Sequence, residues 1–182
     1  MGDRHPVTPP GWSYNPSSWA ERVPLIGAAL AGFAVACYLT LYQLNLIDTV
    51  WEPFFGAGSA TVLHSPVSRA LPIPDASLGA LGYILDAVSG AVGGSDRWRS
   101  RPWIVLLFGV AVGPLGAVSL MLVVFQPLLY RAWCTLCLAS AVASIAMIGP
   151  AMDEVLASLQ FLTRVRREGG SVWRAFWHGS RP

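Results

Sequence analysis

The chain has 182 residues, of which 54% are hydrophobic and 12% are charged, whereas about 25% of the residues of a soluble globular protein are charged. This apolar content excludes intrinsic disorder, and three cysteines are too few for a secreted domain held together by disulfides. A net charge of only +2, from scattered arginines without any lysine, excludes a nucleic-acid-binding surface. The composition, with its positive mean hydropathy, therefore indicates an integral membrane protein.

Four apolar stretches, taken in chain order, are long enough to cross a bilayer, which takes about 20 residues. They cover residues 23–47, 76–95, 102–130 and 132–152, and the one charge within them is Asp86. Residues 1–22 are polar and contain four prolines, so we expect a flexible tail before the first helix. The sequence therefore predicts an all-α integral membrane protein in which residues 23–150 form a bundle of four transmembrane helices.

The arginines predict how this bundle is oriented. Ten of the twelve lie in the two tails and in the connection 95–101, whereas only Arg69 and Arg131 lie in the other two connections. Because positively charged residues are enriched in cytoplasmic segments, we expect both termini in the cytoplasm and a multi-pass location in the inner or plasma membrane. The long loop 48–75 then lies on the extracytoplasmic side.

Four other features each leave two interpretations. Residues 151–182 mix apolar and aromatic side chains with arginines, which favours an amphipathic helix among lipid headgroups over a site for a specific partner. The aromatic-rich loop 48–75, in which residues 59–66 fit a short helix, either caps a cavity or rests on lipid. Cys37 fits a packing residue better than a third redox thiol. Asp86 is either a functional carboxylate or a neutral, hydrogen-bonded group.

The motif Cys134-Thr135-Leu136-Cys137 is the clearest sign of chemistry. Two cysteines three positions apart at the start of a helix share one face and can close a small disulfide ring. The free amide groups and the dipole of the first helical turn favour a thiolate at Cys134, the form that attacks disulfides. The alternatives are two small side chains packed in a helix contact and a zinc site. Zinc needs about four ligands, so we expect a redox pair and no metal.

Together these features resemble the vitamin K epoxide reductase family, specifically its bacterial homologues, over about residues 23–150. The resemblance rests on the four-helix layout and on three motifs in the expected order: Val62-Leu63-His64-Ser65-Pro66, then Pro72-Ile73-Pro74 to Leu78-Gly79 followed by Tyr83, then Cys134-Thr135-Leu136-Cys137. It implies a four-helix bundle around a quinone, either ubiquinone or menaquinone, beneath an extracytoplasmic capping loop that contains a short helix.

The resemblance also implies a function. It is that of a thiol oxidoreductase with quinone as electron acceptor, which supports disulfide-bond formation in extracytoplasmic proteins. Cys137 would face the quinone, and Cys134 would be the outer cysteine that exchanges with a thioredoxin-like or other thiol protein. His64, Ser65 and Tyr83 are candidates to hydrogen-bond the quinone or shape its pocket, the alternative for each being packing of the loop.

One departure from the family opens a second hypothesis. The family usually has two further cysteines in the first loop, which relay electrons to the CxxC pair, but this loop has none, and Ser59 stands where the second would be. Either a donor protein reaches Cys134 directly, or the chain is a non-catalytic membrane module of this family that binds a partner protein. A transporter has little support, because the sequence shows no broken inverted repeat.

Overall fold

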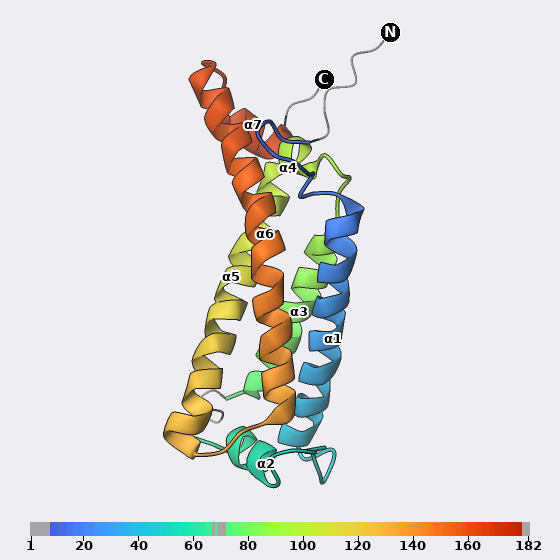
Figure 1. Cartoon of the computed structure of the whole chain (residues 1–182), viewed down its shortest axis with the longest axis vertical. Coiled ribbons are helices and arrows are strands. Elements are labelled where there is room, and N and C mark those ends of the chain that lie inside the picture. The colour runs from blue at the N-terminus through green and yellow to red at the C-terminus, as the bar shows by residue number, and fades with distance from the viewer. Residues whose placement is uncertain (1–7, 67, 69–71, 180–182) are drawn as a thin grey trace.

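The computed structural model describes residues 8–66, 68 and 72–179 of the chain. All regular secondary structure in these residues is helical, which confirms the predicted all-α class (Figure 1). Four long helices run side by side in an elongated bundle, where α1 packs mainly against α3 and α5 mainly against α6. They are α1 (Trp19–Gln43), α3 (Asp75–Ala91), α5 (Pro102–Phe125) and α6 (Thr135–Arg167).

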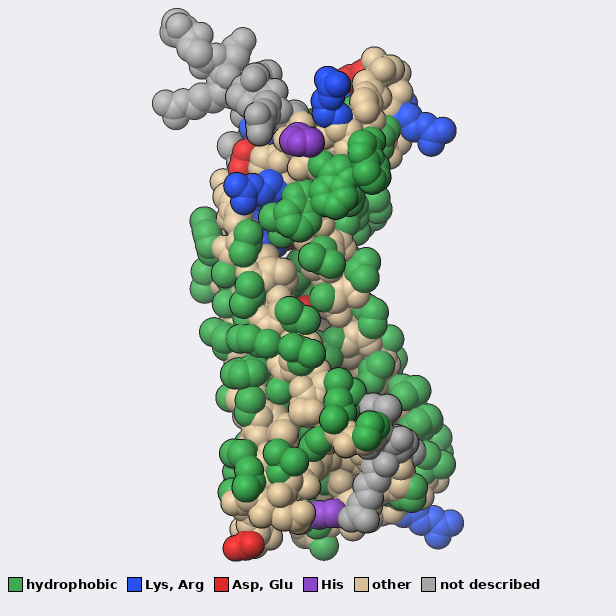
Figure 2. All heavy atoms as spheres, turned by 180° about the vertical axis from the view of Figure 1, so that it is seen from behind, with side chains coloured by type: hydrophobic (Ala, Val, Ile, Leu, Met, Phe, Trp, Pro, Cys, Tyr) green, Lys and Arg blue, Asp and Glu red, His purple; other side chains and the backbone are tan. Residues whose placement is uncertain are grey.

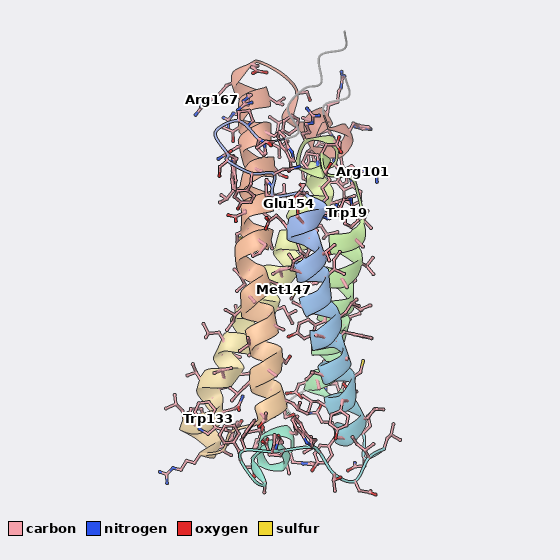
Figure 3. The ribbon with its side chains drawn as sticks, turned by 45° about the vertical axis from the view of Figure 1, so that its right-hand side comes forward. Trp19, Arg101, Trp133, Met147, Glu154 and Arg167 are labelled. Atoms are coloured by element: carbon pink, nitrogen blue, oxygen red, sulfur yellow. A yellow bond between two sulfur atoms is a disulfide. The ribbon has the colours of Figure 1, made fainter. Side chains whose placement is uncertain are left out.

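Short elements close the two ends of the bundle. One end, called the loop end below, carries α2 (Gly58–Leu63) and the π-helical turn η1 (Gln126–Tyr130), and α6 begins there. The opposite end, called the tail end, carries α4 (Arg97–Ser100) and α7 (Val172–His178), and α1 begins there. Figure 3 shows Trp133 at the loop end and Arg101 and Arg167 at the tail end.

Three helical segments are long and apolar enough to cross a membrane, namely Trp19–Gln43, Pro102–Tyr130 and Thr135–Arg167. α3 has 17 residues, fewer than the roughly 20 that a crossing usually takes. The described residues therefore contain three candidate spans where the sequence predicted four. Figure 2 shows hydrophobic side chains along the length of the bundle and charged ones gathered toward its two ends, an arrangement that suits a body surrounded by lipid.

Several helix boundaries differ from those predicted, and at two of them backbone geometry and tertiary contacts explain the difference. α1 ends before residue 47, since Asn45 takes a left-handed conformation with φ 56° and the Leu46 N–H donates to the Leu41 carbonyl at 2.9 Å. α6 runs to Arg167, with Pro150 inside it. The amphipathic segment that we expected from residue 151 is therefore a direct extension of the last long helix, and α7 follows it.

The segment before α1 packs on the tail end. The Trp12 indole N–H donates to the Gln160 side chain at 2.8 Å, and the Tyr14 hydroxyl donates to Asp153 at 2.6 Å. Both acceptors lie on the extension of α6 beyond the predicted span. Of the expected flexible tail 1–22, residues 19–22 thus belong to α1, and the described residues before them contact α6.

Two buried arginines join the helices at the tail end. Arg22 donates to the carbonyls of Gly90 at 2.8 Å and Val92 at 3.0 Å, where α3 ends. Arg97 donates to the Val92 carbonyl at 2.9 Å and forms a buried ion pair with Glu154 of α6. The arginines thus satisfy carbonyl groups that the end of a helix leaves unpaired. They fix α3 against α1 and α6.

Small residues let the long helices approach one another closely. A Cβ atom at Gly32 of α1 would lie 2.4 Å from the Tyr83 ring, so this glycine makes the room that the ring occupies. Gly109 and Gly116 of α5 face side chains of α6 that a Cβ atom would approach to 2.3 and 2.5 Å. Such small residues are typical of contacts between membrane helices, where close backbone approach replaces a hydrophobic driving force.

Candidate functional site

The cysteines of the CxxC motif form a disulfide at the loop end, where α6 begins. Cys134 is the N-cap residue of α6, and the Cα atoms of the two cysteines are 5.2 Å apart. The backbone N–H of Cys137 donates to Sγ of Cys134 at 3.1 Å. The same N–H would stabilise a thiolate on Cys134 once the disulfide is reduced.

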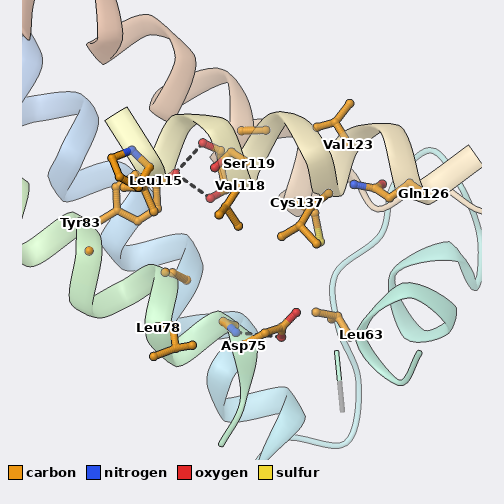
Figure 4. A pocket seen from close by; sticks show the side chains of 18 of the residues that line it. Leu63, Asp75, Leu78, Tyr83, Leu115, Val118, Ser119, Val123, Gln126 and Cys137 are labelled. Carbon is orange, nitrogen blue, oxygen red and sulfur yellow. Dashed lines mark hydrogen bonds between the residues drawn. The ribbon is translucent and has the colours of Figure 1, made fainter. Parts of the chain in front are cut away.

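Cys137 lines a cavity of about 500 Å³ among the four long helices (Figure 4). Most of the wall is formed by apolar side chains of α3, α5 and α6. Five polar residues contribute to it, namely Asp75, Tyr83, Ser119, Gln126 and Ser140. A largely apolar cavity of this size with a few polar groups is typical of a site for a small organic ligand.

Tyr83 joins a cluster of hydroxyl groups at the cavity wall. Its ring is buried, and its hydroxyl donates to the Ser140 carbonyl at 2.6 Å and lies 2.8 Å from the Ser140 hydroxyl. Ser144 lies 2.5 Å from the same hydroxyl and accepts a hydrogen bond from Ser119 at 3.1 Å. The structure therefore brings Tyr83 to the same cavity as Cys137. The three serines were not among the predicted site residues, because serines on apolar helices carry no motif.

His64 and Ser65, the other two candidates for quinone binding, are not among the residues that line this cavity. The His64 ring packs edge-to-face on Tyr42, and its Nδ1 lies 3.0 Å from the Ala60 carbonyl. Ser65 is buried and accepts a hydrogen bond from the Ser68 N–H at 3.2 Å. These contacts hold the C-terminal end of α2 and the chain after it. They correspond to the alternative role in packing of the loop.

Glu52, which the sequence analysis missed, fastens the loop to the start of α6. Its carboxylate accepts hydrogen bonds from the Thr135 N–H at 2.9 Å, from the Thr135 hydroxyl and from the Ser59 hydroxyl. Burial would raise the pKa of Glu52, but the hydrogen bonds from Ser59, Thr135 and Phe54 outweigh it and lower the pKa to about 2. The sequence feature that could have pointed to Glu52 is a single acidic residue within an aromatic stretch of the loop.

The loop covers the CxxC pair closely. The backbone of α2 passes so near that a Cβ atom at Gly58 would lie 2.0 Å from the Trp133 carbonyl oxygen. The Phe55 and Trp133 rings are 6.4 Å apart between centroids. The Cys134 side chain has no exposed surface, whereas Cys137 borders the cavity. Cys134, expected to be the outer cysteine, is therefore shielded in this closed arrangement, because the loop and α2 fold over it.

Gln126 connects the end of α5 to Cys134. Pro127 has no N–H to donate to the preceding turn, and at this point α5 widens into the π-helical turn η1. The residue after η1, Arg131, has a left-handed conformation with φ 47°. The buried Gln126 side chain then reaches the start of α6, where its Oε1 accepts a hydrogen bond from the Cys134 N–H at 2.8 Å. The hydropathy pattern predicted a helix that continues to residue 130, and it gave no sign that Gln126 has a special position.

Asp86 and Cys37 are not among the residues that line the cavity. Asp86 is buried, and its carboxylate oxygens have no hydrogen-bond partner among the described residues. Cys37 is a free cysteine that packs against the hydrophobic core, as the packing interpretation predicted. Within the described ranges, no three histidine, cysteine or acidic residues are grouped closely enough to hold a metal ion.

Comparison with known proteins identifies one family. The model of the Vitamin K epoxide reductase family matches residues 23–151, a segment that contains Glu52, Tyr83, Gln126 and both cysteines of the disulfide. No curated protein matches the chain.

Proposed function

Because the chain belongs to the vitamin K epoxide reductase family, whose members are membrane thiol–disulfide oxidoreductases, we propose that it oxidises thiols of extracytoplasmic proteins and passes the electrons to a membrane quinone. The observation that carries the proposal is the position of the disulfide. Cys134 and Cys137 are bonded at the loop end, and Cys137 borders an apolar cavity of about 500 Å³. A thiol-reactive pair therefore lies beside a site for a small membrane-soluble ligand.

The cavity fits the head group of ubiquinone or menaquinone. Its wall is mostly apolar, as a flat ring with an isoprenoid tail requires, and its polar side chains are few. Asp75, the one charged residue in the wall, is already bound by the side chains of Gln43 and Ser68. When bound, a quinone supplies the capacity to accept two electrons and two protons.

The thiol chemistry follows from the positions of the two cysteines at the start of α6. A donor thiolate attacks Sγ of Cys134, forming a mixed disulfide and releasing Cys137 as a thiolate at the cavity. A second donor thiol then attacks the mixed disulfide, so that the donor leaves oxidised and both cysteines are reduced. Re-formation of the Cys134–Cys137 bond delivers two electrons and two protons to the quinone. The N–H of Cys137, which faces Sγ of Cys134, makes Cys134 a good leaving group in the second step.

The membrane arrangement that accompanies this function has four crossings. Three apolar helices and the family make the chain a multi-pass membrane protein, and α3, which runs alongside them, is the fourth crossing of the proposal. An even number of crossings puts both tails on the same side of the membrane, and the arginine distribution favours the cytoplasmic side. The loop end with α2 then forms the cap on the extracytoplasmic side of an inner or plasma membrane, and α7 lies among the lipid headgroups.

The second candidate is a non-catalytic membrane module that binds a partner protein. The observation in its favour is the missing relay, since Ser59 takes the place of a loop cysteine and donates its hydroxyl to Glu52. In the oxidoreductase the donor must reach Cys134 directly, which requires the loop to open. In the non-catalytic module the disulfide has only a structural role.

Redox cycling of the disulfide tests the proposal. The full-length protein in lipid nanodiscs is reduced with a dithiol, then mixed with menadione or a short-chain ubiquinone, and free thiols are counted by maleimide gel shift. A Cys37→Ser background removes the third thiol. We expect quinone to restore the disulfide and to be reduced stoichiometrically, and we expect Cys137→Ser to abolish both. A pair that stays reduced in the presence of quinone would overturn the oxidoreductase and favour the module.

A further inference from the structure

The Gln126 side chain is fixed in a single orientation at the cavity. Its Oε1 lies 2.8 Å from the Cys134 backbone nitrogen. Its own carbonyl accepts the N–H groups of Arg131 and, at 3.4 Å, of Ala132. Because a backbone N–H can only donate, the side-chain atom facing Cys134 must be the amide oxygen, which leaves the amide nitrogen on the other side.

That amide nitrogen is an unused donor. Gln126 lines the cavity and is 2% exposed, and Nε2 has no hydrogen-bond partner in the described part of the chain. Figure 4 shows the nitrogen on the side of Cys137. Because this nitrogen faces the open space of the cavity rather than closed protein, it is available to a ligand that accepts a hydrogen bond there.

The other polar groups of the cavity are already paired. The Tyr83 hydroxyl is hydrogen-bonded to the carbonyl and hydroxyl of Ser140, and the Ser119 hydroxyl donates to the Ser144 hydroxyl. The Asp75 carboxylate accepts a hydrogen bond from the Ser68 hydroxyl of the loop. Among the described residues of the wall, Nε2 of Gln126 is thus the free donor beside the redox pair, and a ligand with an acceptor oxygen satisfies it. Quinone carbonyl oxygens have this character.

Resting on the proposed function, we propose that Nε2 of Gln126 donates a hydrogen bond to a carbonyl oxygen of the quinone bound next to Cys137. The same side chain holds the Cys134 N–H through Oε1, so it sets the ring in a defined position relative to the disulfide. The hydrogen bond strengthens as negative charge develops on that oxygen, which favours electron transfer over mere binding.

The test compares Gln126→Met, which removes donor and acceptor at similar length, with the control Leu120→Met, an apolar exchange on the exposed surface of α5 outside the cavity wall. Full-length protein in nanodiscs is titrated with menadione and with a short-chain ubiquinone isotope-labelled at its carbonyls. Dissociation constants and the infrared carbonyl band of the bound quinone are measured. Gln126→Glu, in alkaline buffer, keeps an oxygen for the Cys134 N–H while removing the amide donor. The rate at which dithiothreitol reduces the disulfide without quinone reports separately on the position and accessibility of Cys134.

We expect Gln126→Met to weaken binding of both quinones about tenfold and to return the carbonyl band to its frequency in apolar solvent, with Gln126→Glu losing the shifted band as well. Leu120→Met should match the wild type. A variant that changes only the dithiothreitol rate, with the carbonyl band unaltered, would overturn the inference while leaving the proposed function intact. Failure of the wild type to bind either quinone would overturn both.

Discussion

Glu52 provides the most direct test of how the loop controls the disulfide. Its carboxylate accepts hydrogen bonds from the Ser59 hydroxyl, from two groups of Thr135, and from the backbone N–H groups of Phe54 and Phe55 at 3.3 Å. Glu52→Gln keeps the shape of the side chain but replaces one acceptor oxygen with an NH₂ group that faces donors. We therefore expect the loop to open more often over Cys134.

The magnitude follows from the charge that these hydrogen bonds hold. Burial opposes ionisation, yet the pKa of Glu52 falls from 4.5 to about 2, which corresponds to roughly 3 kcal/mol of stabilisation of the ionised form. Because the side chain is partly exposed and the glutamine retains one acceptor, we expect a loss of about 2 kcal/mol. If attack on Cys134 needs the open loop, this loss raises its rate about 30-fold.

The pH dependence has a defined sign. A carboxyl whose pKa is lower in the folded protein stabilises it fully above its ordinary value of 4.5 and loses that contribution as the pH falls toward about 2. Reduction of the wild-type disulfide should therefore accelerate in acid between these values. Glu52→Gln should be fast throughout and lack this acceleration.

The assay is the rate of reduction of the disulfide by tris(2-carboxyethyl)phosphine, which remains reactive in acid, followed by maleimide gel shift in nanodiscs. Asp48→Asn is the matched control, since it makes the same acid-to-amide change on an exposed side chain of the same loop. Equal rates for wild type, Glu52→Gln and Asp48→Asn would refute the view that the carboxylate holds the loop closed.

Three further predictions concern packing and buried polar groups, each read from thermal unfolding of the protein in detergent. Gly109→Ala puts a methyl 2.3 Å from a side-chain carbon of α6 and should cost about 1–3 kcal/mol, whereas Gly113→Ala, with nothing within 4 Å, should be neutral. Equal melting temperatures for the two would contradict the close α5–α6 contact. Tyr83→Phe removes the hydroxyl at the centre of the serine cluster and should cost about 1–2 kcal/mol; an unchanged melting temperature would show that the cluster is not stabilising. Arg97→Met leaves the buried carboxylate of Glu154 without its ion pair and should cost about 3–5 kcal/mol. Adding Glu154→Met should recover part of that loss, and a double variant no more stable than Arg97→Met would speak against it.

The long apolar helices could be predicted because a membrane span is a local property of composition. Three stretches of the predicted four became helices that are long and apolar enough to cross a membrane. Their ends could not be read in the same way. The turn after α1 depends on the conformation of Asn45, and the extension of α6 depends on partners such as Arg97 that pair with it from elsewhere in the chain.

The candidate site divides along the same line. The CxxC spacing by itself places two cysteines on one helical turn, and the structure joins them in a disulfide. Tyr83 was predicted as a site residue because of its place in a family motif, and its packing against Gly32 positions it at the cavity wall. His64 and Ser65 belong to the same kind of motif, but α2 directs them into contacts of the loop.

The sequence alone therefore determined the membrane class, the family and the redox motif, because each depends on composition or on residues that are close together in the chain. Only the tertiary structure decided that Cys134 is buried and that Glu52 of the loop accepts a hydrogen bond from Thr135 at the start of α6. It also decided that the side-chain amide of Gln126 faces the cavity. Glu52 and Thr135 are 83 positions apart. Hydrogen bonds at that separation exist only once the helices have packed, since no local pattern of residues encodes which distant groups will meet.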